Sequence, residues 1–62
     1  MMKYTQINSQ QVFAAISNGL DVIICDFNDS KIWHTNTLTV ETIRNFIGLT
    51  GIAFFKAEEI TT

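Results

Sequence analysis

Residues 22–35 read VIICDFNDSKIWHT, and this stretch decides the fold. Its first six residues, 22–27, are rich in β-branched side chains and predict a strand. Residues 28–30 predict a turn, because Asn, Asp and Ser side chains can hydrogen-bond to nearby backbone groups. Residues 31–35 predict the returning strand. The stretch therefore indicates a β-hairpin, whose register stays open because no Asn-Gly or Asp-Gly pair defines the turn type.

A first helix precedes the hairpin and is predicted over residues 9–18. Asn8 is suited to the N-cap position, and Gln11 follows three residues later, as in a capping box. Apolar side chains then recur at helical spacing. Asn18-Gly19 provides a left-handed stop, which ends the helix.

A second helix and a last strand follow the hairpin. Thr39 is placed to cap the helix and Gly48 to end it. Residues 52–57 read IAFFKA and predict the last strand. Truncation of Phe46 in the second helix is expected to unfold the protein, because this side chain faces the sheet. The predicted core consists of apolar residues on both helices: Val12, Phe13, Ile16, Ile43, Phe46 and Ile47.

The order of these elements predicts an α+β fold. The chain is expected to form a three-stranded antiparallel sheet in α-β-β-α-β order, with both helices on one face. Residues 2–6 can add a short N-terminal edge strand, which gives a βαββαβ arrangement of the split βαβ type. Sixty-two residues are enough for one small domain, so residues 1–62 are expected to form a single unit.

Cysteine and histidine usage argues against a stabilising bridge or a metal. The single cysteine, Cys25, excludes an internal disulfide. Cys25 and His34 together cannot supply the four ligands that a structural zinc site draws mostly from these two residue types. We therefore expect neither a metal nor another cofactor, and a core this small needs support from dense packing or from a second chain.

Charge and hydropathy argue against two kinds of partner. Four Lys and Arg residues are scattered along the chain against six Asp and Glu residues, which gives a net charge of −2. Nucleic-acid binding depends on clustered basic residues, so we expect none. No stretch approaches the roughly 18 apolar residues of a membrane span, and the first residues have no signal-peptide pattern. The chain is therefore expected to be cytoplasmic, without a membrane partner.

Two residues are worth considering as a catalytic pair. If the hairpin has a two-residue turn, Cys25 lies directly opposite His34, and a thiolate beside an imidazolium would be a nucleophile. The alternative is that Cys25, flanked by apolar residues in a strand, is a small hydrophobic side chain. We favour this second interpretation, but a thiol enzyme or redox sensor using Cys25 and His34 stays open.

The strands are more apolar than a sheet with one face in water requires. Such a sheet alternates apolar and polar residues, whereas here both alternating sets are apolar. One explanation is that the N-terminal segment with Tyr4 covers the second face. The favoured explanation is that the second face is an interface. The residues predicted to form this binding interface are Trp33, Phe54, Phe55, Ile24 and Val22.

In its size, its lack of catalytic residues and its capped helix–hairpin–helix layout, the chain resembles accessory proteins of phages and mobile elements. The resemblance implies a protein that binds a host enzyme or its own copies. The function expected from the sequence is therefore that of a non-catalytic protein-binding module: an inhibitor, a regulator or a self-assembling subunit. A homodimer is expected, because two apolar sheet faces packed together would extend a small core.

Overall fold

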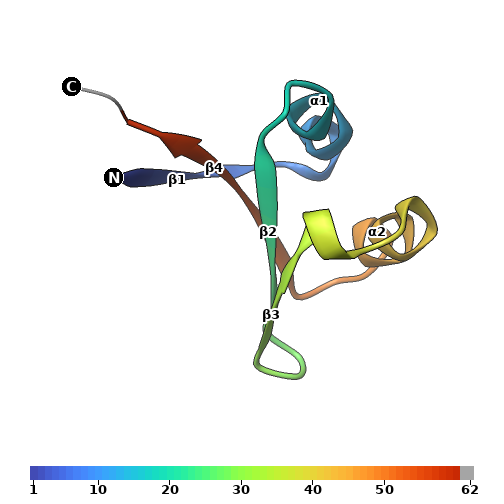
Figure 1. The fold of residues 1–62 in the computed structure, drawn as a ribbon. Helices are drawn as coiled ribbons and strands as arrows, with labels where there is room; N and C mark the ends of the chain where they lie inside the picture. Colours follow the sequence, from blue (N-terminus) through green and yellow to red (C-terminus); the bar gives the residue numbers. More distant parts are fainter. Residues whose placement is uncertain (61–62) are drawn as a thin grey trace.

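Residues 1–60 are described by a computed structural model of the chain, and Figure 1 shows how their elements are arranged. This part of the chain contains four strands and two α-helices, with one 3-10 turn before each helix. The elements, in chain order, are β1 (Met2–Ile7), η1 (Ser9–Gln11), α1 (Val12–Ser17), β2 (Asp21–Asp26), β3 (Lys31–His34), η2 (Thr35–Thr37), α2 (Val40–Ile47) and β4 (Ile52–Glu59).

The strands form one antiparallel sheet in the order β1-β4-β2-β3. Because every neighbouring pair is antiparallel, β1 and β2 run in the same direction with β4 between them. In the same way β3 and β4 run in one direction with β2 between them. Each helix therefore connects two parallel strands that are separated by a third, which is a split βαβ unit. The α+β class is confirmed, and the N-terminal segment forms a full strand that makes the sheet four-stranded within residues 1–60.

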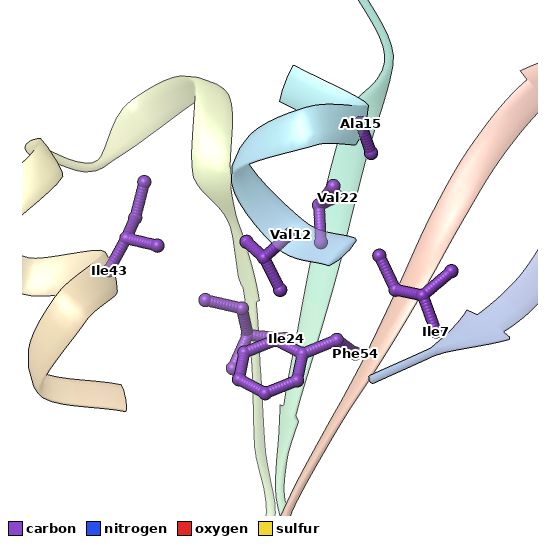
Figure 2. Close-up of a cluster of buried hydrophobic side chains, with 7 residues drawn as sticks. All are labelled: Ile7, Val12, Ala15, Val22, Ile24, Ile43 and Phe54. Carbon is purple, nitrogen blue, oxygen red and sulfur yellow. The ribbon is translucent and has the colours of Figure 1, made fainter. Parts of the chain in front are cut away.

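Both helices pack on the same side of the sheet (Figure 1). The side chains of the core cluster lie between the helices and the sheet, mainly its central strands β2 and β4 (Figure 2). They come from both layers, and the fully buried ones are contributed mainly by β2. The hydrophobic core cluster consists of Ile7, Val12, Ala15, Val22, Ile24, Ile43 and Phe54.

The predicted core is correct in part. Val12 and Ile43 are buried as expected. The other four predicted residues, Phe13, Ile16, Phe46 and Ile47, are only partly buried at the edge of the cluster. The helices are short, with six residues in α1 and eight in α2. Each helix therefore has few side chains that reach the middle of the sheet.

The hairpin between β2 and β3 has a four-residue loop, residues 27–30, because Asp26 pairs with Lys31. The Asp26 carboxylate Oδ1 accepts hydrogen bonds from the backbone N–H groups of Asn28, at 3.0 Å, and Asp29, at 3.3 Å. Ser30 then adopts a φ of 54°, in the left-handed region that closes the loop. A buried aspartate therefore sets the hairpin register.

The capping box predicted before α1 is confirmed. The backbone N–H of Gln11 donates to Asn8 Oδ1 at 3.1 Å, and the backbone N–H of Asn8 donates to Gln11 Oε1 at 3.0 Å. The box starts a 3-10 turn that leads into α1. Gly19, with a φ of 80°, ends the helix in the left-handed region, as predicted.

Removal of this cap has a modest expected cost. Asn8→Ala is expected to lower the free energy of unfolding by about 1 kcal/mol, because the orphan N–H groups of the first turn lose their partners. Urea unfolding followed by circular dichroism measures the change. Gln10→Ala in the same turn removes an exposed side chain outside the box and should leave stability unchanged. Equal stability of Asn8→Ala and the parent would contradict the capping role.

Candidate functional site

One face of the sheet is left uncovered, because both helices pack on the other face (Figure 1). Within residues 1–60 no helix packs against this side, which we call the open face. Side chains alternate between the two faces along each strand, so the pairing register identifies its members. The open face consists of Met2, Tyr4 and Gln6 on β1, Ala53, Phe55, Ala57 and Glu59 on β4, Asp21, Ile23 and Cys25 on β2, and Ile32 and His34 on β3.

A shallow groove of about 410 Å³ crosses the open face over all four strands. Its most exposed apolar side chains belong to the two edge strands: Tyr4 is 56% exposed and Ile32 is 67% exposed. The groove side chains on the central strands, Ile23, Cys25 and Phe55, are half-buried, because strands flank them on both sides. The groove is lined by Tyr4, Ile23, Cys25, Ile32, His34 and Phe55.

The open face carries few charges, and those it carries are paired. His34 Nδ1 lies 2.9 Å from Asp21 Oδ2, and the N-terminal amino group lies 2.9 Å from Glu59 Oε1. The four Lys and Arg residues of the chain lie elsewhere. Lys3, Lys31 and Lys56 point to the helix side of their strands, and Arg44 is on α2. The groove is therefore an apolar surface with a pair of polar contacts at its margin.

The structure divides the five residues that were predicted to form one binding interface. Phe55 lies on the open face and lines the groove. The other four, Trp33, Phe54, Ile24 and Val22, lie on the helix side. Ile24 pairs with both Trp33 and Phe54, so these three form one row under the helices. Val22 and Ile24 are fully buried and Phe54 nearly so. The prediction that these residues share the exposed face with Phe55 is wrong.

Trp33 is on an edge strand but packs against α2. Its ring lies 5.9 Å from the ring of Phe46, and Lys31 Nζ lies 5.9 Å from the Trp33 ring centroid. The Trp33 Nε1 atom is buried without a hydrogen-bond partner among residues 1–60. This aromatic side chain therefore helps to hold α2 on the sheet.

Cys25 and His34 are not directly opposed. The four-residue loop pairs Cys25 with Ile32, and it pairs His34 with Ile23. The two side chains share the open face, but His34 lies opposite Ile23, which is two residues from Cys25 along β2. His34 Nδ1 contacts Asp21 instead. The direct pairing of Cys25 with His34 depended on a two-residue turn, and it does not occur because Asp26 caps a four-residue loop.

Sequence reasoning missed Tyr4, Ile23 and Ile32 as members of the candidate site. Tyr4 was considered as a cover for the second face, but β1 pairs with the edge of β4 and widens that face instead. The sequence does indicate that Ile32 and Trp33 lie on opposite faces of the sheet, since neighbouring residues on a strand point to opposite faces. Which of the two residues faces the helices depends on packing, which the pattern alone does not specify.

No α-helix in the described part of the chain has the length and apolar character needed to span a membrane. Comparison of the chain with protein families, with curated proteins and with solved structures finds no match. A function is therefore inferred from the geometry and chemistry of the open face.

Proposed function

We propose that this protein is a non-catalytic protein-binding module that uses the open face of its sheet. The observation that carries the proposal is the apolar groove bordered by Tyr4 and Ile32, two large side chains that are more than half exposed. Apolar surface of this kind, rimmed by polar groups, is typical of sites where proteins associate. Such a module fits an inhibitor, a regulator or a self-assembling subunit.

The chemistry of the groove favours a protein over other macromolecules. Phosphate backbones are bound mainly by Lys and Arg, and in residues 1–60 the open face carries neither. Aromatic and aliphatic side chains around a half-buried centre are the usual anchors of protein interfaces. Phe55 and Ile23 form that centre, and Tyr4 and Ile32 border it. The expected partner presents an apolar surface to this groove.

The effect of a charge in the groove tests the proposal. Ile32→Glu is expected to weaken partner binding at least tenfold, about 1.4 kcal/mol, because an unpaired carboxylate would be buried against apolar atoms. Tagged protein is incubated with a lysate of its native host that also contains untagged copies of the chain. Retained proteins are then measured by quantitative mass spectrometry.

Val40→Glu is the matched control. Val40 is also an exposed β-branched residue, at 55% exposure, but it lies at the start of α2, away from the open face. A negative charge there is compatible with the helix N-terminus. Loss of partners with Ile32→Glu but not with Val40→Glu supports the open face. Equal retention by both variants, or retention no greater than with a tag alone, contradicts the proposal.

A further inference from the structure

We infer that the occupant of the open face is a second copy of this chain, packed sheet against sheet across a two-fold axis. The inference rests on the proposed function, because it specifies the partner of the same surface. Two sheets that pack face to face lie about 10 Å apart, with side chains of both inner faces interdigitating. Three properties of the open face fit this arrangement: its charges, its shape and its size.

The charges on the open face are compatible with a copy of itself. Both of its carboxylates have partners within the chain: Glu59 is paired with the N-terminal amino group, and Asp21 is hydrogen-bonded to His34. Two such faces can therefore meet without bringing unpaired like charges together. A strongly acidic or basic partner would find no complementary charge in the groove. A second copy matches the apolar character of this surface.

The shape of the open face is also self-complementary. Tyr4 lies in a row with Ala57 and Asp21, and within residues 1–60 this row has no member on β3. Ile32 lies in a row with Cys25 and Ala53, which has no member on β1. The two protruding side chains thus occupy opposite corners of the sheet.

Consider a two-fold axis that lies midway between two such sheets and runs either parallel or perpendicular to the strands. It places the Tyr4 corner and the Ile32 corner of one copy over the two vacant corners of its partner. Tyr4 of one copy then faces one vacant corner of its partner, and Ile32 faces the other. The protruding side chains therefore do not collide. One vacant corner is bordered by the small residue Ala53 on β4 and the other by Asp21 on β2, so each protruding side chain can pack beside one of these two residues.

The size of the face predicts a weak dimer. Four strands about 4.8 Å apart and about six residues long, at 3.3 Å per residue, cover roughly 19 by 20 Å. This is roughly 380 Å² on each copy, or roughly 760 Å² for both, which is below the about 1,200 Å² of standard specific interfaces and fits weak, transient association. We therefore expect a dimer with a dissociation constant on the order of 100 µM.

Cys25 provides a direct reporter, because it is partly exposed and lines the groove. Its alkylation by iodoacetamide is expected to slow by about threefold or more between about 5 µM and about 500 µM protein, since the dimer hides the thiol. Sedimentation velocity over the same concentrations should show the monomer giving way to the dimer. Val40→Glu should behave as the parent in both measurements.

Ile32→Glu should stay monomeric, with a Cys25 alkylation rate that is independent of concentration. Tyr4→Glu, on the opposite edge strand, should do the same, so a folding defect in one variant leaves a second test. A parent protein that stays monomeric throughout, with constant Cys25 reactivity, overturns the second-copy inference. In that case the proposed function still stands if a host protein is captured in an Ile32-dependent manner, and it fails if none is.

Discussion

Ile24→Ala is expected to leave much of the protein unfolded at 25 °C. Ile24 is fully buried at the centre of the core, between Trp33 on β3 and Phe54 on β4. Truncation of a buried isoleucine to alanine costs about 2–5 kcal/mol. A 62-residue chain has about 3–9 kcal/mol of stability in total, at typical values per residue. The loss is therefore a large share of the whole, and urea unfolding followed by circular dichroism measures it.

Ile32→Ala is the matched control, because it truncates an isoleucine on the neighbouring strand that is 67% exposed. At low micromolar concentration it should change stability by less than about 0.5 kcal/mol. Phe46→Ala should fall between the two, since Phe46 is only partly buried and packs on Trp33. If Ile32→Ala were as destabilising as Ile24→Ala, the assignment of the two sheet faces would be wrong.

Gly51→Ala is expected to lower stability by about 2–3 kcal/mol. Gly51 has a φ of 75°, where an alanine costs about 1–2 kcal/mol. A Cβ atom there would also lie 2.8 Å from Asn28 Nδ2, which donates a hydrogen bond to the Thr50 carbonyl oxygen. Displacement of the Asn28 side chain would weaken that bond, at about 1 kcal/mol more. Thermal unfolding of the variant and the parent at one concentration gives the difference.

Gly48→Ala provides the comparison at the end of α2. Its φ is −81°, and the nearest atom to a new Cβ is the Asn45 carbonyl oxygen at 3.8 Å. This substitution should leave stability unchanged or raise it by about 0.4–1 kcal/mol, since alanine reduces the freedom of the unfolded chain. Similar melting temperatures for the two variants would contradict both the backbone strain expected at residue 51 and the stabilising role of the Asn28 hydrogen bond to Thr50.

On the two central strands, alternate residues serve different roles: one set stabilises the fold and the other lines the proposed binding surface. On β2, Val22 and Ile24 face the helices, whereas Ile23 and Cys25 face the groove. Substitutions at the first pair are expected to act on folding, and substitutions at the second pair on association. On β4 the same division falls between the adjacent residues Phe54 and Phe55. Effects on folding and on binding should therefore follow the period of two of the sheet.

Local signals in the sequence were sufficient for the elements themselves. Asn8 with Gln11 marks the start of the first helix and Thr39 that of the second, and the structure has a side-chain cap at each. Gly19 ends the first helix with the positive φ that glycine tolerates. These features depend on interactions between residues a few positions apart, so the chain around them specifies them. The α+β class follows from the order of these elements, whereas the sequence offered β1 only as a possible edge strand and the structure made it a full one.

Only the tertiary structure decided which apolar residues are covered. Both alternating sets of β2 and β4 are apolar, so periodicity did not distinguish the set under the helices from the set on the open face. The hairpin register depended on Asp26, whose capping of Asn28 and Asp29 selects a four-residue loop. That register, together with the packing of Phe46 on Trp33, placed Trp33 inside and Ile32 outside. Which face is covered depends on contacts between helices and strands that are distant along the chain. Both helices pack on one face of the sheet, so the other face stays exposed.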